Sequence, residues 1–482
     1  MTHSECTIEP TEKIPAAGSV LSDASFETAR QLAQELTAAG VWKQAGEKLH
    51  RLSPVPFPLE SSEVAYIRNL GKAVWSFYKA LNQLYLWKGH DWAKEWLDQG
   101  KPSWLIDLAR MNYSKQHLPR LLRPDLILGD GKMWVTELDS VPGGAGDTAT
   151  MSQFYEERGM SVLGGRMGIP ESFARVVNGL AQSETWNLAI VVSDESEDYR
   201  AEMTALAGQL RMLGHNAWCV HPRDVLFDEE GLWLSNSGAR ERIDVMWRFF
   251  ELFDLRNISK SELFAYASKK KKVVVSPPFK PFMEEKLALG LLHHALLSDF
   301  WMQQMGDHFT LLRNSVPKTW IMDPTPVPKH CEIAGLQYRG KPVRDFRELA
   351  DATQKERRLV IKPSGFSPLA WGSRGVVVGH DVSQEEWADA IDNALASFSH
   401  TPYILQEFHE GRRLDTPYWD PSTGRHGKMH GRARLSPYYY AVEDEPHLAG
   451  VLATICPDNK KLIHGMSDAV MTVCAEENLD RV

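Results

Sequence analysis

Cysteine is scarce in this sequence, and its few positions exclude two classes of site. Five cysteines are scattered through 482 residues, and no two of them have C-x-x-C spacing. That pattern argues against a zinc site and a disulfide framework, and it is typical of a reducing compartment. Hydrophobic runs are also short, since none approaches about 18 residues, and the N-terminal segment is too polar for a signal peptide. We therefore expect a cytoplasmic protein with no membrane partner.

Positive charge is in short supply as well. Lysine and arginine together number 54 against 63 acidic residues, which gives a formal net charge of −9. An excess of negative charge argues against a general binder of nucleic acid or of a membrane surface. The sizeable basic run, Lys269–Lys272, is better explained as the end of a helix before a strand. We therefore expect no nucleic-acid partner.

The chain does have the length and composition for several domains. Its hydrophobic fraction of 43% and charged fraction of 24% are ordinary, and 482 residues exceed one hydrophobic core. Apolar residues recur at helical spacing over Phe26–Lys48 and Ser61–Gln99, and residues 186–220 show a strand–helix–strand pattern. These patterns predict an α+β (α/β) chain. We divide it into four regions: a tail and helical region (1–115), an acidic hairpin region (116–185), a small α/β subdomain (186–275) and a C-terminal region (276–482).

Two short apolar segments and a glycine turn predict a β-hairpin. Leu126–Leu128 would be its first strand, Gly129–Gly131 its turn and Met133–Leu138 its second strand. A glycine-rich turn at residues 142–146 follows the hairpin. Its backbone N–H groups could bind an anion, or the segment could simply be a tight loop.

Three carboxylates and one guanidinium belong to this hairpin. Asp125 is expected at the mouth of the first strand, close to Arg123. Glu137 and Asp139 are two residues apart on the second strand, so their side chains leave the same face of the sheet. Converging carboxylates are ligands that Mg²⁺ prefers. Alternatively, these acids only solvate a strand end and a turn.

A lysine downstream stands in an unusual position. Met283–Phe300 is predicted to be a helix, and Lys286 lies in its first turns. A cation near a helix N-terminus opposes the helix dipole, so it needs another explanation. Exposure to solvent is one explanation, and an anion held in a site is another.

A second lysine introduces a flexible loop. Leu359–Ile361 and Val376–Val378 are predicted strands, and the loop Ser364–Gly375 between them follows Lys362. A lysine at a strand end provides a point charge for phosphate oxygens, and a glycine-bearing loop can fold over them. The segment matches neither G-x-x-x-x-G-K-[ST] nor G-x-G-x-x-G, so the loop alone does not identify a nucleotide site.

A third polar motif ends the next strand. Tyr403–Gly411 is predicted to be a strand that leads into Gln406 and Glu407. A glutamate in a hinge can accept a hydrogen bond from a ribose hydroxyl, while backbone groups there can bind an adenine edge. An edge strand with a solvated glutamate is the alternative. Further antiparallel strands and a closing helix, Ser467–Ala475, complete the predicted pattern.

Taken together, these motifs resemble the ATP-grasp ligases in a circularly permuted order, similar to the glutathionylspermidine synthase-like group. In that order R-x-D comes first, followed by E-x-D/N, P-P-x-K-x(5)-K, a K-P loop and a Q-E hinge. The matching residues are Arg123 and Asp125, Glu137 and Asp139, Pro277-Pro278-Phe279-Lys280 with Lys286, Lys362-Pro363, and Gln406-Glu407. The resemblance covers Leu121–Asp147 and Ser276–Ala475, and it is slight over the N-terminal helices.

The resemblance implies a permuted ATP-grasp fold with a small Rossmann-like α/β subdomain and N-terminal helices. The hairpin region would be the metal-site part of the core, and residues 276–482 would bind the nucleotide. Asp125, Glu137 and Asp139 would hold one or two Mg²⁺ ions. Arg123 would be catalytic, because it would stabilise the transferring phosphoryl group or the acylphosphate.

The remaining matches would bind ATP. Lys286 and Lys362 would contact its phosphates from two subdomains, and Gln406 with Glu407 would line the adenosine end. The loop after Lys362 would close over the triphosphate through four small residues: Ser364, Gly365, Gly372 and Gly375.

The implied activity is an ATP-dependent carboxylate–amine ligase. It would form an amide or peptide-like bond through an acylphosphate and release ADP and phosphate, with a small-molecule carboxylate and amine as partners. A small-molecule kinase and a catalytically silent nucleotide-binding protein remain alternatives. Asp139 stands where the family usually has asparagine, which leaves open whether one or two metal ions bind. The sequence specifies neither the two substrates nor the oligomeric state.

Overall fold

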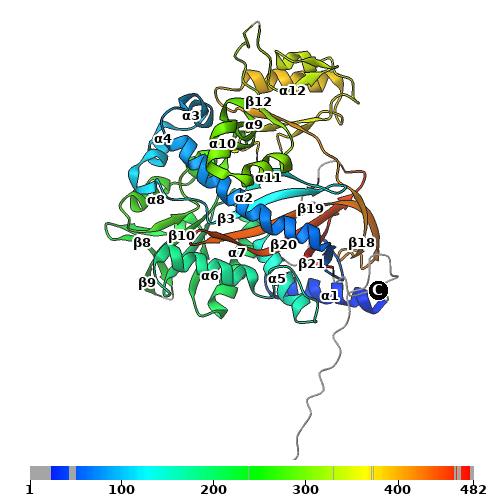
Figure 1. The fold of residues 1–482 in the computed structure, drawn as a ribbon. Coiled ribbons are helices and arrows are strands. Elements are labelled where there is room, and N and C mark those ends of the chain that lie inside the picture. Colours follow the sequence, from blue (N-terminus) through cyan, green and yellow to red (C-terminus); the bar gives the residue numbers. More distant parts are fainter. Residues whose placement is uncertain are drawn as a thin grey trace, which may run out of the picture.

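The computed structural model describes residues 23–42, 50–139, 141–236, 238–328, 330–370, 372, 374–460, 463 and 468–477. Helices and sheets are mixed throughout, as the α+β prediction requires (Figure 1). Most of the predicted N-terminal tail lies outside the described residues. Within the described ranges, no helix combines the length and apolarity needed to span a membrane.

A mixed sheet lies at the centre of the molecule and contains the acidic hairpin. Over the described residues its strands follow the order β18–β1–β21–β20–β19–β3–β4, and β2 pairs with β21. Their bounds are β1 Arg51–Leu52, β2 Phe57–Leu59, β3 Leu121–Leu128, β4 Met133–Asp139, β18 Arg413–Trp419, β19 His426–Val442, β20 Glu445–Pro457 and β21 Val470–Glu476. The predicted hairpin is confirmed as β3 and β4, and β3 also pairs with β19.

Helices cover both faces of this central sheet (Figure 1). α2 (Ser61–Leu86) packs on one face, while α5 (Ala145–Glu156) and α6 (Gly168–Ala181) pack on the other. Gly71 of α2 allows a close approach, because a Cβ there would lie 2.5 Å from the ring of Tyr439 on β19. With helices on both sides, the middle strands bury both of their faces.

A smaller sheet of parallel strands follows in the chain. Its order is β11–β10–β5–β6, and all of its pairings are parallel over the described residues. The strands are β5 Asn187–Val192, β6 Asn216–Val220, β10 Val245–Phe249 and β11 Val274–Ser276, with α7 (Arg200–Met212) between β5 and β6. The predicted strand–helix–strand unit is therefore confirmed. A small antiparallel sheet (β7 Leu226–Asp228, β8 Gly231–Asn236, β9 Ala239–Arg242) and α8 (Ser261–Lys269) lie beside it.

A third, antiparallel sheet carries the Lys362 loop. Its strand order is β12–β17–β15–β16, and it lies with α12 at the upper end of the molecule in Figure 1. Its strands are β12 Thr319–Ile321, β15 Leu359–Pro363, β16 Val377–Val378 and β17 Tyr403–Glu407; α12 spans Gln384–Ala396, and the short hairpin β13 Gln337–Tyr338 with β14 Lys341–Pro342 accompanies it. The strands predicted on both sides of the loop and at the Q-E motif are confirmed.

The other α-helices of the described residues are α1 Asp23–Ala38, which has 16 residues, and five shorter ones: α3 Asp91–Asp98, α4 Ser103–Arg110, α9 Leu287–His293, α10 Ser298–Met305 and α11 Asp307–Ser315. The single helix predicted over Met283–Phe300 is wrong, since the chain breaks after α9, where His294 is extended (φ −68°, ψ 124°). The break lets Trp301 fold back, fully buried, and donate its indole N–H to Leu291 O at 2.8 Å. Tertiary burial thus overrides the helical periodicity.

The closing helix predicted over Ser467–Ala475 is also wrong. Ser467 lies outside the described residues, and Val470–Glu476 forms β21. This strand lies between β20 and β1, so its side chains are buried on both faces. A short apolar run without alternation fits a doubly buried strand as well as a helix, which explains the error.

Candidate active site

The hairpin register brings the predicted acids and the predicted arginine together. Arg123 of β3 stands opposite Asp139 of β4, and Asp125 stands opposite Glu137. β3 begins at Leu121, so Asp125 lies within the strand and not at its mouth, as the sequence had suggested. The pairing of β3 with β19 extends the strand past the short apolar run that was visible in the sequence.

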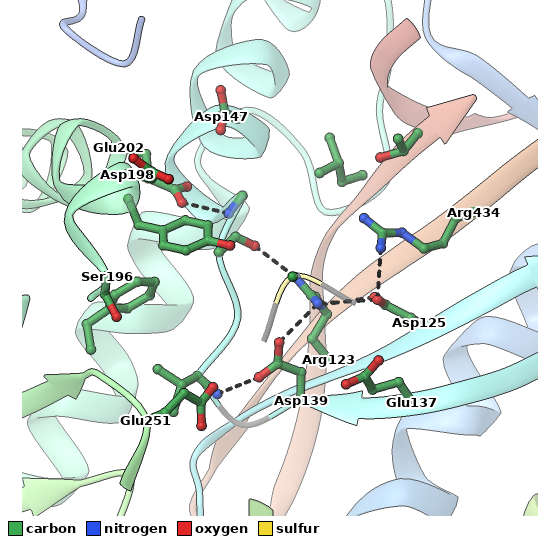
Figure 2. A pocket seen from close by; sticks show the side chains of 18 of the residues that line it. Arg123, Asp125, Glu137, Asp139, Asp147, Ser196, Asp198, Glu202, Glu251 and Arg434 are labelled. Atoms are coloured by element: carbon green, nitrogen blue, oxygen red, sulfur yellow. Dashed lines mark hydrogen bonds and ion pairs between the residues drawn. The ribbon is translucent and has the colours of Figure 1, made fainter. Parts of the chain in front are cut away.

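These four side chains open into one cavity of about 700 Å³. Lys286 lines it as well, and so do Gly365 and Gly372 from the loop after β15. The cavity lies between the central sheet, the parallel sheet and that loop, so segments far apart in the sequence meet there. Figure 2 shows Arg123 between Asp125 and Asp139, with Arg434 on the far side of Asp125.

Asp125 is held between two guanidinium groups. Arg123 Nε lies 3.1 Å from its Oδ1, and Arg434 Nη1 lies 3.2 Å from its Oδ2. Ser436 Oγ donates to Oδ1 at 2.9 Å. Burial would raise the pKa of Asp125, but the two arginines and the serine hydroxyl hold it below the ordinary value. Asp125 therefore carries a full negative charge at neutral pH.

The other two carboxylates differ in their pKa. Asp139 receives Arg123 Nη2 at 3.0 Å and the Val141 N–H at 2.9 Å, yet burial raises its pKa in spite of Arg123. For Glu137, burial is outweighed by Lys286, whose Nζ lies 2.8 Å from Oε1, and by Lys362, so its pKa falls. Each acid thus has a cationic neighbour within the cavity wall.

Lys362 lies behind this wall. Its Nζ donates to Thr136 O at 3.0 Å and to Gln406 Oε1 at 2.8 Å, which joins β15 to β4 and β17. Burial lowers the pKa of Lys362 to about 8. Gln406 is buried and donates in turn to Thr319 Oγ1 at 3.0 Å, while Glu407 pairs with His409 at 3.5 Å.

The structure therefore unites only part of the predicted set. Arg123, the three acids, Lys286, Gly365 and Gly372 line the cavity, whereas five other described residues from the predicted set do not: Lys362, Ser364, Gly375, Gln406 and Glu407. Ser364 is buried, and its hydroxyl donates to Glu285. Lys280, from the same motif as Lys286, lies elsewhere and donates to Asn82 Oδ1 and to two backbone carbonyls near the N-terminal helices.

Sequence reasoning missed most of the opposite wall. It carries further carboxyl groups from distant segments: Asp147, Asp198, Glu202, Glu251 and Glu284. Sequence reasoning also missed Arg434, which lies on the hairpin side of the cavity beside Asp125. A sequence pattern could have identified Arg434, because Arg432, Arg434 and Ser436 alternate along a predicted strand and so share one face of it. No local pattern could have identified the acids, since only long-range folding brings them to the cavity.

Glu202 binds the backbone N–H groups of the glycine-rich turn, which the sequence had suggested as a possible anion site. Its carboxylate accepts the Gly144 N–H at 2.8 Å and the Gly146 N–H at 3.0 Å, so an internal carboxylate occupies the amides at the start of α5 (Figure 2). Burial, followed by the nearby Asp147, raises the pKa of Glu202 to about 8. Burial also raises the pKa of Asp147 to about 6, although the Trp42 indole donates to it.

Glu251 and Glu284 complete the acidic wall. Glu284 pairs with the buried Arg248 and accepts the Leu252 N–H at 3.3 Å. Among the described residues, no hydrogen bond or ion pair engages the side-chain carboxyl of Glu251, whose backbone carbonyl accepts the Asp254 N–H at 3.0 Å. Burial, followed by Glu284 and Asp139, raises the pKa of Glu251 well above its ordinary value. A cation that enters beside Glu251 would favour the ionised form of this carboxyl group.

The donor set suits magnesium in its chemistry, but it is engaged with protein cations. Asp125, Glu137 and Asp139 offer carboxylate oxygens on one face of the hairpin, the ligand type that Mg²⁺ takes. Over the described residues, however, no three His, Cys, Asp or Glu side chains are grouped so as to hold a metal ion. Lys286 and the two arginines supply the counter-charge in this arrangement.

Comparisons with known proteins bear on the fold. No protein-family model and no curated protein matches the sequence. Among solved structures, the apoform of a glutathione synthetase-like effector (GSS30) from Globodera pallida superposes with a TM-score of 0.59 at 11% identity, over 95% of this chain and 98% of that one. The chain shares the overall fold of that structure.

The shared fold runs almost the full length of both chains. A second structure, named as a candidate gamma-glutamylcysteine synthetase from Methylobacillus flagellatus KT, gives a TM-score of 0.37 at 10% identity, over 83% of this chain and 84% of that one. The second value is too low to support an argument. The first value supports the overall fold alone.

Proposed function

We propose that this protein is an ATP-dependent carboxylate–amine ligase, which forms an amide through an acylphosphate and releases ADP and phosphate. One observation carries the proposal. A single cavity is lined by three cations, Arg123, Arg434 and Lys286, beside the hairpin acids, and by an acidic wall that includes Glu251. A carboxylate, a triphosphate and an amine need both kinds of charge when they react in one place.

We further propose an ATP-grasp arrangement in permuted order. The hairpin region (116–185) and residues 276–482 would form the core, while residues 186–275 and the N-terminal helices (1–115) would flank it. The shared sheet supports this arrangement, because β3 pairs with β19 of the C-terminal region and β4 pairs with β3. The loop between β15 and β16 supports it as well, since Gly365 and Gly372 line the cavity beside Lys286.

The first step would be phosphoryl transfer. A substrate carboxylate oxygen would attack the γ-phosphorus of ATP, a P–O bond would form, and the bond to ADP would break. Arg123 faces the cavity between two acids, so it is held in place to receive negative charge on the transferring group. Lys286 and, from behind β4, Lys362 would provide further positive charge for phosphate oxygens.

The second step would be attack by the amine. Its nitrogen would bond to the acylphosphate carbonyl carbon, the C–O bond to phosphate would break, and the ammonium proton would need an acceptor. An ammonium group beside Glu251 would favour the ionised form of that carboxyl, which could then take the proton. The acidic wall of the cavity is thus suited to the amine.

Magnesium would be held by Asp125, Glu137 and Asp139, whose oxygens fit it. When bound, the ion would supply counter-charge to the terminal phosphates. Lys286 and the arginines would then have to share these carboxylates or move toward the phosphates. Asp139, where asparagine is usual in the resembling family, would add a negative charge to the metal site.

The proposal is tested with the purified protein, ATP, Mg²⁺ and a panel of small carboxylates, each with and without a panel of small amines. We expect ADP release that depends on both substrates and a product whose mass equals acid plus amine minus water. A product that carries only an added phosphate, with every amine, would show a kinase instead. ATP that is bound but never consumed would show a silent binding protein.

A further inference from the structure

Three consecutive residues, Glu284-Glu285-Lys286, lie where four parts of the chain meet. Glu284 pairs with Arg248 of the parallel sheet, and Lys286 pairs with Glu137 of the hairpin. Both of these residues line the cavity, but the side chain of Glu285 points elsewhere. The partners of the Glu285 side chain matter for the site, because Glu285 lies between two residues that line the cavity and its position affects theirs.

The first partner of Glu285 comes from the N-terminal helical region. Lys101 Nζ lies 2.6 Å from Glu285 Oε1, and both side chains are fully buried. Lys101 also donates to Gln99 O at 3.2 Å and lies 5.6 Å from the ring centre of Phe366. A buried ion pair is weak evidence for a purely stabilising role, because well-packed apolar side chains often serve as well.

The second and third partners belong to the loop after β15. Ser364 Oγ donates to the same Oε1 at 2.5 Å, and the Phe366 N–H approaches it at 3.4 Å. Between them, Gly365 lies so close that a Cβ would be 1.8 Å from Glu284 O. The base of the loop therefore rests on the backbone of Glu284 and Glu285, directly before Lys286.

One oxygen atom thus serves three donors. Oε2 of Glu285 has no hydrogen-bond partner among the described residues, so Oε1 alone joins Lys101 to the loop base. A displacement of this carboxylate would move the loop base relative to Lys286. Gly365 and Lys286 both line the cavity, so the geometry of the proposed phosphate-binding end would change with it.

We propose that Glu285 is a positioning residue: it holds the loop base 364–366 at a fixed place beside Lys286, so that loop and lysine contact the nucleotide together. The part of this proposal that concerns the nucleotide rests on the proposed function. The part that concerns the position of the loop does not, and it can be tested without any ligand. Neither Glu285 nor Lys101 needs to touch a substrate.

The sharpest variant is Ser364→Ala, because it removes a donor from the loop and leaves the Lys101–Glu285 pair intact. Ser114→Ala is the matched control, since Ser114 is also buried and its hydroxyl donates to backbone carbonyls away from the cavity. Trypsin cleavage after Arg374, an exposed residue of the same loop, is followed by mass spectrometry without nucleotide. We expect cleavage about tenfold faster in Ser364→Ala than in the control, the ratio that corresponds to one hydrogen bond to a charged group.

A second pair of variants separates positioning from stability. Glu285→Gln leaves the buried Lys101 ammonium without a counter-charge and should lower the thermal midpoint of unfolding. The double variant Lys101→Met with Glu285→Gln removes both charges and keeps an oxygen acceptor for the loop. Relative to the single variant Glu285→Gln, the double variant should have a higher thermal midpoint and slower cleavage after Arg374. In Ser364→Ala the KM for ATP should rise about tenfold with kcat within about threefold, since only binding geometry is disturbed.

Equal cleavage of Ser364→Ala and Ser114→Ala would overturn the proposal. Faster cleavage with an unchanged affinity for ATP would also overturn it, because the loop base would then be fastened without serving the nucleotide. If wild-type protein binds no ATP at all, the proposed function fails, while the cleavage ratio still decides whether Glu285 fastens the loop.

Discussion

At the scale of single residues, Glu202 shows how strongly burial acts in this cavity. The pKa of Glu202 is raised to about 8, so the folded protein holds a proton that the unfolded chain releases near the ordinary value of 4.5. The contribution of this proton to the free energy of unfolding is fully present below pH 4.5, the ordinary pKa, and is lost as the pH rises through about 8. We expect the free energy of unfolding to fall by on the order of 2 kcal/mol between pH 5 and 8.

Glu202→Gln tests this expectation, because the amide does not titrate and keeps one oxygen acceptor for the Gly144 or the Gly146 N–H group. Urea unfolding at several pH values should give a flatter pH dependence in the variant than in wild type. Glu229→Gln, at an exposed position, serves as the control. The same slope in all three proteins would show that Glu202 does not bind the proton.

The positions of single site residues were predicted correctly where a rule of local structure, such as strand alternation, applied. Alternation along a strand placed Glu137 and Asp139 on one face, and the register confirms that Arg123 and Asp125 face them. Local rules fail where distant segments meet. Nothing in the sequence near Glu251 indicates that it closes the opposite wall, and nothing near Ser364 indicates that its hydroxyl turns away from the cavity toward Glu285.

At the scale of elements, the contact between α2 and the central sheet depends on one glycine. A Cβ at Gly71 would lie 2.5 Å from the Tyr439 ring, which is itself held by a hydrogen bond from its hydroxyl to Ile67 O at 2.6 Å. Gly71→Ala should therefore lower the free energy of unfolding by about 1–3 kcal/mol, in spite of the better helix propensity of alanine. Urea unfolding measures the change.

Gly179 on α6 provides the matched control. It is a helical glycine with no atom within 4 Å of a Cβ position. Gly179→Ala should raise the free energy of unfolding by about 0.5–1 kcal/mol, because only helix propensity changes there. Stabilisation by both substitutions would mean that α2 is packed less closely than the structure shows.

Helices and strands were predicted correctly where their hydrophobic residues followed a clear helical or alternating pattern. The hairpin, the strand–helix–strand unit and the strands around Lys362 carried clear patterns, and all are confirmed. The helical spacing over Ser61–Gln99 divides into α2 and α3 at the exposed Trp87. The two larger errors fell on apolar runs whose burial is complete. In β21 both faces are covered, so no alternation survives, and in 283–300 the burial of Trp301 breaks a periodic helix.

At the scale of the whole molecule, the proposed ligands should stabilise the protein through linkage. ATP with Mg²⁺ at a hundred times its dissociation constant should raise the free energy of unfolding by about 2.7 kcal/mol. Glu137→Gln should lose the magnesium-dependent part of this gain, and Lys362→Met should lose most of the nucleotide-dependent part, because each removes one charge from the site. Thermal unfolding with ATP alone, Mg²⁺ alone and both together separates the two contributions.

This measurement needs no turnover, so it tests the binding site apart from the reaction. An exposed lysine away from the cavity provides the control variant, Lys355→Met. Equal stabilisation of the wild type, Glu137→Gln and Lys362→Met would place the ligands somewhere other than beside the hairpin.

The pairing of β3 with β19 has a consequence for biosynthesis. Leu126 meets Leu435 in this ladder, so a ribosome must add some three hundred residues before the hairpin gains its neighbour. During that interval the nascent chain exposes an unpaired strand edge, the kind of surface that invites wrong association. Recombinant production should therefore benefit from slow translation and from chaperones that shield early segments until the late strands emerge.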